Sequence, residues 1–316
     1  MIGKLNRLAM LSVLVVAVTT SQALGMEKNL AGVPELQKSR LQQSIVRLAD
    51  GQKDAYPLSV PLIASAQHGD TATYRLLLKK VNTALTEVDK VDAFRAWILG
   101  RVLFAADSIH DRDTVKATER ELAQLLADEK LQNLDPGSLD HAMVAWAYGY
   151  FAGVSRQNYE QMKVPMLLAL SKLEFAARQD TSGHDRVSNA VWAAVLVVNA
   201  SANVQDREIY DDTLSRLKAI GDKGSVSSVL ETALTRTADS SDYPAWTIGM
   251  VRVSATTMRD RLLESELAQP LRDAIRQARE WAAEPEQTGK NQWKAESEVV
   301  LGELSELLIR SEQTGS

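Results

Sequence analysis

The stretch FRAWILGRVLFAA, residues 94–106, holds Trp97 followed three positions later by Gly100 in a largely apolar context. The motif AWxxG recurs twice along the chain, and a related segment keeps the tryptophan but has valine at the glycine position. The later members are Trp146 with Gly149, Trp192 with Val195, and Trp246 with Gly249. Intervals of 49, 46 and 54 residues between these tryptophans are typical of helical units that recur along a chain.

The repeated spelling favours a packing joint between helices over a ligand site. Residues three apart share a helix face, so the missing side chain at Gly100, Gly149 or Gly249 leaves a notch beside the indole. A neighbouring helix can approach closely there, which offsets the roughly 1 kcal/mol that glycine costs inside a helix. The alternative is a row of exposed aromatic side chains that captures a ligand. The intervals between the tryptophans resemble the repeat length of HEAT and armadillo proteins more than the shorter tetratricopeptide repeat. They do not identify a family.

Helical periodicity also dominates the rest of the chain. Apolar residues between 74 and 88 recur at three- and four-residue steps, at Tyr74, Leu77, Leu78, Val81, Leu85 and Val88. No segment alternates apolar and polar residues over the length of a strand. We therefore predict an all-α fold, an array of antiparallel helical hairpins built as an α-solenoid or multi-helix bundle, with roughly ten to twelve helices and no significant sheet.

Two segments depart from the amphipathic pattern. Residues 190–198, AVWAAVLVV, are apolar on every side, which predicts a helix at the centre of the core. Residues 56–69, YPLSVPLIASAQHG, carry Pro57 and Pro61 and predict a short broken helix.

The N-terminus has the layout of a secretory signal peptide. Lys4 and Arg7 precede an apolar run at 8–18, and a small-residue segment follows, with cleavage expected after Ala23 or Gly25. We predict a signal peptide over 1–23 and a single repeat-like helical domain over 24–316, with a possible subdivision near 130–138. The mature protein would then be periplasmic or secreted and would have no integral membrane segment.

Composition excludes several classes of function. The chain contains no cysteine, so disulfides, thiol nucleophiles and thiolate metal sites are all excluded. The formal charge of −5 would become −7 once Lys4 and Arg7 are removed. An acidic exported chain is a poor candidate for binding nucleic acid or anionic lipid. It would suit a basic protein partner instead.

A second repeated spelling, HDR, starts at His110 and again at His184. The adjacent histidine and aspartate resemble the His-Asp pair of the HD-type metal phosphohydrolases, and the resemblance is limited to those two residues. Both pairs lie just ahead of an expected helix, where Asp111 and Asp185 are suited to capping or to the first turn. His68 could serve as a further ligand, although nothing selects it. Helix capping is therefore the favoured interpretation, and a metal site is the alternative.

Other catalytic patterns are absent or incomplete. The stretch TSGHDR, followed by Ser215-Arg216, resembles part of the vanadium-haloperoxidase and acid-phosphatase signature, but Asp222 stands where that family needs its histidine. The four histidines, with His141 completing the set, show no metal-ligand spacing. A lone acid of the lytic transglycosylase kind could lie among the glutamates Glu264, Glu266, Glu296 and Glu298. We predict no specific catalytic, metal or cofactor residues.

The sequence thus predicts an exported, non-enzymatic, protein-binding scaffold, adaptor or inhibitor/immunity protein of the bacterial envelope. This step is an analogy from architecture, because helical arrays present long concave surfaces that commonly bind proteins. The alternative is a helical envelope hydrolase that depends on a metal or acts on peptidoglycan.

Overall fold

The computed structural model describes residues 35–179, 184–220, 225–232, 243–285 and 289–315. Throughout these ranges the chain forms helices and no strands, which confirms the predicted all-α class. Twelve of the described helices have 14 residues or more: α2 (Glu35–Ala49), α3 (Ala55–His68), α4 (Thr71–Leu85), α5 (Ala93–Ser108), α6 (Arg112–Leu126), α8 (Leu139–Val154), α9 (Arg156–Gln179), α10 (His184–Asn203), α11 (Arg207–Ile220), α13 (Pro244–Thr257), α15 (Ala268–Ala283) and α16 (Lys290–Gly315). Short helices α7 (Glu129–Gln132), α12 (Val226–Thr232) and α14 (Arg261–Glu266) bring the count slightly above the expected one.

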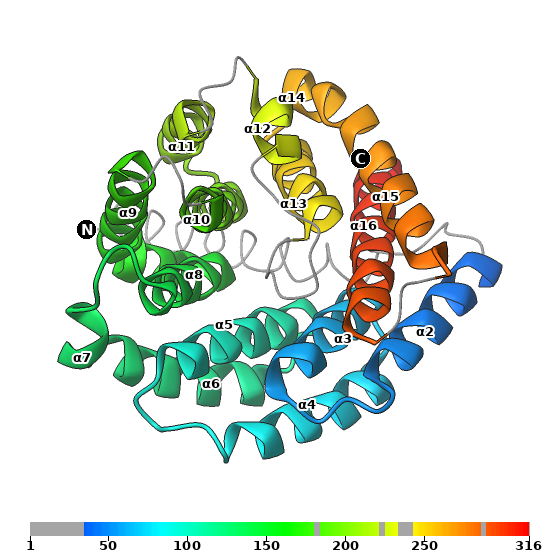
Figure 1. Ribbon diagram of the computed structural model, residues 1–316, viewed down its shortest axis with the longest axis horizontal. Coiled ribbons are helices and arrows are strands. Elements are labelled where there is room, and N and C mark those ends of the chain that lie inside the picture. The colour runs from blue at the N-terminus through cyan, green and yellow to red at the C-terminus, as the bar shows by residue number, and fades with distance from the viewer. Residues whose placement is uncertain (1–34, 180–183, 221–224, 233–242, 286–288, 316) are drawn as a thin grey trace, which may run out of the picture.

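The long helices form two concentric rings (Figure 1). Helices α3, α5, α8, α10, α13 and α16 make the inner ring, and each packs against the next. Helices α2, α4, α6, α9, α11 and α15 cover them from outside. The chain alternates between the two rings, so all inner helices run in the same direction. Helix α16 packs on both α2 and α3, which closes the ring between the two ends of the described chain.

Four turns from the inner to the outer ring share one design. A residue with positive φ precedes an aspartate whose side chain accepts a hydrogen bond from the backbone N–H three residues later. The pairs are Gly69-Asp70, His110-Asp111, Gln205-Asp206 and Arg259-Asp260, with φ at the first residue of 81°, 60°, 61° and 57°. A left-handed residue followed by an N-cap ends one helix and starts the next within a very short turn.

The predictions for the two segments without an amphipathic pattern, residues 190–198 and 56–69, differ in outcome. Residues 190–198 lie within α10 and are buried on every side, as predicted for a central helix. The prediction of a broken helix over 56–69 is wrong, because α3 runs without interruption from Ala55 to His68 with Pro61 inside it. Residues 58–66 are almost completely buried against neighbouring helices. This burial outweighs the helix hydrogen bond that Pro61 cannot donate.

The predicted signal peptide over 1–23, with its cleavage sites, lies outside the described residues. The single domain over 24–316 and its subdivision near 130–138 stay predictions. Among the described helices, none combines the length and apolar character needed to cross a membrane.

Candidate functional site

The three AWxxG glycines lie where consecutive inner helices make close contact. A Cβ atom added to Gly149 would stand 2.6 Å from the nearest side-chain atom across the interface, and one added to Gly100 would stand 3.1 Å away. At Gly249 the added atom would overlap a side chain of α16. The facing residues are Tyr150 for Gly100, Leu196 for Gly149 and Ser305 for Gly249. The glycines are therefore packing joints, as the sequence predicted.

Each inner helix also contributes one aromatic side chain to the centre of the ring. We call this set the central aromatic layer; its members are Tyr56, Trp97, Trp146, Trp192, Trp246 and Trp293. Neighbouring rings pack with centroids 5.1 Å apart for Tyr56 and Trp97, and 5.2 Å apart for Trp97 and Trp146. The Trp192 and Trp246 rings are likewise 5.1 Å apart. Parallel inner helices bring these residues together although they lie far apart in the sequence.

Arg101 lies in the middle of this layer. It follows Trp97 by one turn on α5, and only 1% of its surface is exposed. Its guanidinium carbon is 5.4 Å from the ring centroid of Tyr56, 5.3 Å from that of Trp97 and 5.4 Å from that of Trp246. These contacts are within the range of cation–π attraction. Arg101 therefore joins α5 to α3 and α13 across the centre of the ring.

The Nε and Nη2 atoms of Arg101 are buried, and neither has a hydrogen-bond partner in the described part of the chain. Two adjoining donors share this condition, the indole Nε1 of Trp97 and the hydroxyl of Tyr150. An unpaired buried donor costs on the order of 1–3 kcal/mol, and more when it is charged. Such groups in a native protein call for an acceptor such as an ordered water, an ion or a ligand.

Helix α16 adds two buried charged residues one turn apart, Lys294 and Glu298, which are 1% and 0% exposed. The Lys294 ammonium lies 3.4 Å from the ring centroid of Tyr243. The hydroxyl groups of Tyr243 and Tyr56 are 2.7 Å apart and share a hydrogen bond. Among the described residues, the centre therefore buries charged groups of both signs, on Arg101, Lys294 and Glu298.

The buried tyrosines of the centre stay protonated. Burial raises the pKa of Tyr150 to about 12, although the nearby charge of Arg101 acts in the opposite direction. Burial is also the main cause that raises the pKa of Tyr243, and both Tyr56 and Glu298 add to the effect. Near neutral pH the hydroxyl of Tyr150 can consequently donate a hydrogen bond.

The central aromatic layer reaches the surface at one side. Tyr56 and Trp293 are only partly buried, as is Phe94, whose ring packs edge-on against Trp97. The Trp293 indole donates to the backbone oxygen of Leu48 over 2.9 Å, which fixes its orientation.

The histidine–aspartate pairs have a structural role where the structure describes them. Asp111 caps α6, and its carboxylate accepts a hydrogen bond from the Tyr74 hydroxyl over 3.1 Å. Asp185 lies in the first turn of α10, as expected, while the His184 side chain is outside the described part. No group of three or more potential metal ligands gathers in the described residues. His68 contacts the Lys38 backbone oxygen instead.

Of the four glutamates singled out in the sequence, Glu298 alone is buried, at the centre of the ring. The others lie nearer the surface, where Glu264 accepts a hydrogen bond from Gln313, Glu266 from the Ser227 backbone and Glu296 from Gln292.

Arg101 was not identified from the sequence. Its signal is a single charge inside the apolar stretch WILGRVLF, on the same helix as a notch glycine.

Comparison with protein-family models, curated proteins and solved structures finds no match to this chain.

Proposed function

We propose that the protein is a non-enzymatic binding protein that holds a small ligand in the central aromatic layer. The observation that carries this proposal is the packing of three side chains of the layer, Tyr56, Trp97 and Trp246, around the buried guanidinium of Arg101. Apolar side chains would fill a purely structural centre at lower cost, since a buried charge needs paired donors. Ligand sites commonly combine apolar walls with a few placed polar groups.

A thermal-shift and tryptophan-fluorescence titration tests the proposal, with D-glucose, N-acetylglucosamine, D-glucuronate and benzoate as probes. Two tryptophans on adjacent helices provide a matched pair, Trp293 in the layer and Trp281 on α15 outside it. We expect a saturable response to at least one probe, weakened by Trp293→Phe and unchanged by Trp281→Phe. No saturable response, or equal responses from both variants, would contradict the proposal.

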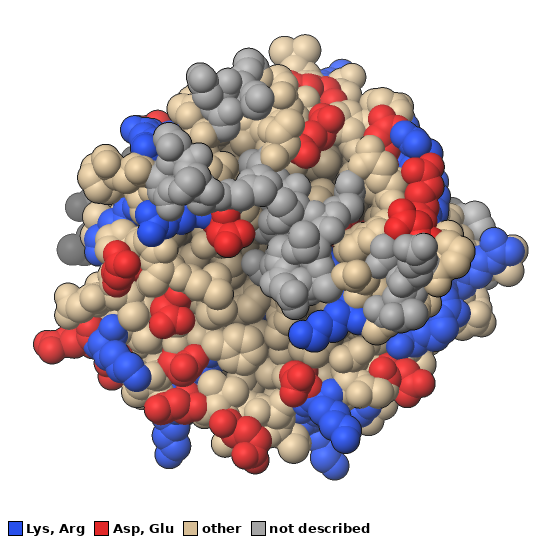
Figure 2. All heavy atoms as spheres, viewed as in Figure 1, with Lys and Arg blue, Asp and Glu red and all other residues tan. Residues whose placement is uncertain are grey.

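A protein-binding scaffold is the second candidate, but it would use the outer surface because the described inner ring is closed. Helix α9 exposes an apolar stripe formed by Val164, Leu168 and Phe175, each more than half exposed. Exposed apolar side chains along one helix favour a protein partner. Charges of both signs are interspersed on the face seen in Figure 2, so a basic partner would rely on the net charge rather than on an acidic patch of that face.

Crosslinking in native envelopes, followed by mass spectrometry, tests the scaffold. We expect the double change Val164→Ser and Phe175→Ser to abolish a stoichiometric crosslink, while Leu262→Ser does not. Leu262 is a suitable control because it is 86% exposed but belongs to α14. A crosslink that survives the double change would rule out the α9 stripe.

An envelope hydrolase is favoured by one observation, the buried carboxyl group of Glu298 beside aromatic walls. A general acid in such a site would protonate a leaving group on a peptidoglycan glycan strand. Incubation with purified sacculi would release soluble fragments if this alternative holds, and Glu298→Gln would stop the release. Absence of release by folded protein would support a binding role.

The proposed compartment is the periplasm or the extracellular space, on the strength of the basic and apolar pattern of residues 1–23. Mass spectrometry of the N-terminus of the protein isolated from cells provides the test. A start at Leu24 or Met26 is expected, and an intact segment with Lys4 and Arg7 would contradict export with cleavage.

A further inference from the structure

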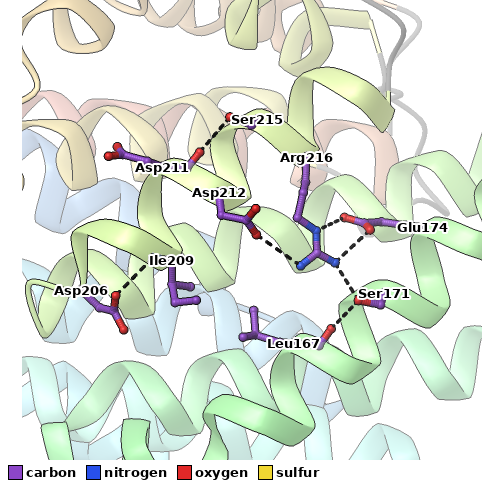
Figure 3. A network of polar contacts seen from close by, with 9 residues as sticks. All are labelled: Leu167, Ser171, Glu174, Asp206, Ile209, Asp211, Asp212, Ser215 and Arg216. Carbon is purple, nitrogen blue, oxygen red and sulfur yellow. Dashed lines mark hydrogen bonds and ion pairs between the residues drawn. The ribbon is translucent and has the colours of Figure 1, made fainter.

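Two arginines of this chain use the same edge of the guanidinium in opposite ways. In Arg216, Nε and Nη2 donate to the two carboxylate oxygens of Glu174, each over 2.9 Å (Figure 3). This side-on pair is the bidentate geometry with which arginine binds carboxylates. In Arg101 the same two atoms are buried, and no described residue accepts a hydrogen bond from either of them.

Within the described part of the chain, no oxygen atom accepts a hydrogen bond from this edge of Arg101. Rings of Tyr56, Trp97 and Trp246 surround the guanidinium at 5.3–5.4 Å and stabilise its charge through their π faces. The Tyr56 hydroxyl is already engaged with that of Tyr243. An acceptor for Nε and Nη2 therefore has to come from outside the set of described side chains.

The chemistry of the neighbouring groups narrows the choice of acceptor. Trp97 Nε1 and the protonated Tyr150 hydroxyl are further buried donors next to Arg101, and neither has an acceptor among the described residues. A ligand that satisfies the Arg101 guanidinium and these two donors needs negative charge and several oxygen acceptors. It also needs a flat or ring-shaped body to pack against the central aromatic layer.

We infer that Arg101 binds the carboxylate of a small, ring-bearing carboxylic acid through its Nε–Nη2 edge, with the ring of the acid packed in the central aromatic layer. This inference rests on the proposed function and specifies the ligand class for that site. A carboxylate is planar and presents two oxygens at the spacing of the two donors, as Glu174 does for Arg216.

The test compares the affinity of the full-length folded protein for each acid with its affinity for a neutral analogue of that acid, called its neutral twin below. D-Glucuronate is paired with D-glucose and benzoate with benzamide, and inorganic phosphate is a third probe. Tryptophan fluorescence and the unfolding temperature report binding. We expect an acid to bind at least about tenfold more tightly than its neutral twin, because only the acid engages both donors.

Variants then locate the site. Arg101→Lys keeps the positive charge but loses the side-on edge, so we expect at least about tenfold weaker binding of the acid. Arg207→Lys is the matched control, because Arg207 packs 5.3 Å from the ring centroid of Tyr210 but lies outside the centre. Equal affinity of Arg101→Lys and the unchanged protein for the acid would overturn the inference.

The comparison of each acid with its twin needs no variant, so the inference stays falsifiable even if Arg101→Lys fails to fold. Equal binding of acid and neutral twin would overturn the carboxylate but leave small-ligand binding at the centre intact. If phosphate binds as tightly as the acids, the site recognises oxoanions in general, and the inference of a carboxylate ligand is overturned. Absence of any response would contradict both the inference and the proposed function.

Discussion

The junction between α9 and α11 and the centre of the inner ring both bury charged groups, yet they satisfy them differently. At the junction, Arg216 pairs with the largely buried Glu174 through two hydrogen bonds and also contacts Ser171 and Asp212 (Figure 3). At the centre, Arg101 packs against three aromatic rings while two of its nitrogens lack an acceptor among the described residues.

The difference separates a structural arginine from a candidate binding arginine. A paired buried charge holds two helices together, and removal of one partner leaves the other buried without compensation. An unpaired buried donor weakens the ligand-free protein and is compensated only when a ligand supplies the acceptor. The same residue type thus stabilises the fold at one place and is available for recognition at the other.

The largest effect is expected at the junction. Arg216→Leu should lower the free energy of unfolding by about 3 kcal/mol, because the Glu174 carboxylate would remain largely buried without its partner. Urea unfolding followed by circular dichroism measures the change. The double variant Arg216→Leu with Glu174→Leu should recover much of the loss. If the single change costs less than about 1 kcal/mol, the pair is not a structural lock.

The next effect concerns the joints that hold the aromatic layer. Gly249→Ala should destabilise by about 2 kcal/mol, because the added Cβ overlaps Ser305 in α16. Gly153→Ala is the matched control, since its added Cβ meets nothing nearer than 3.8 Å. The control should stabilise by roughly 0.5–1 kcal/mol through helix propensity. Thermal unfolding of both variants provides the measurement, and similar effects in both would refute the joint at Gly249.

A smaller effect of opposite sign is expected at Asp107 on α5. Glu174 has Arg216 as an ion-pair partner, whereas Asp107 forms no ion pair within the described residues. Burial, followed by the negative charge of Glu119, raises the pKa of Asp107 from 3.8 to about 6. The folded state therefore binds the proton more tightly, so stability falls as pH rises from about 4 through 6, and the deficit persists above that window.

Asp107→Asn should consequently raise stability at pH 7 by about 1 kcal/mol and flatten the pH dependence between about 4 and 6. Denaturant unfolding at a series of pH values measures both. The exposed Asp50 supplies the control, and Asp50→Asn should leave both the stability at pH 7 and the pH dependence of unfolding unchanged. A fall in stability at pH 7 in the Asp107 variant would show that the ionised carboxylate is favourable.

The smallest effect is expected at Arg101 itself in the absence of ligand. Arg101→Met should change the free energy of unfolding by less than about 1 kcal/mol, or stabilise the protein, because it removes a buried charge whose donors lack partners. Urea unfolding measures the difference. A loss near that of Arg216→Leu would mean that Arg101 is a structural residue, and the contrast between the two regions would fail.

Local features of the fold could be predicted from sequence. The helices follow from the apolar periodicity, the notch glycines from their spacing to tryptophan, and the cap role of Asp111 from its place ahead of a helix. Ring closure could not, because it depends on contacts between distant segments, such as the hydrogen bond from Trp293 to Leu48. Such contacts leave no local pattern in a single sequence.

The candidate site was harder to predict for a related reason. Glu296 and Glu298 are two residues apart in the same glutamate-rich helix, and only the packing of α16 shows which of them is buried. Arg101 stands in an apolar helix, where a long side chain could equally extend toward solvent. Only the convergence of helices that lie far apart in the chain surrounds it with aromatic rings.

The most direct test of the central claim is the resonance of each arginine Nε–H in ¹⁵N-arginine-labelled protein during titration with D-glucuronate or benzoate. We expect the Arg101 signal to shift saturably as its edge gains a carboxylate, while the Arg216 signal, already paired with Glu174, stays in place. Assignment comes from Arg101→Lys and Arg216→Lys. An Arg101 signal that does not move at saturating acid would contradict the account.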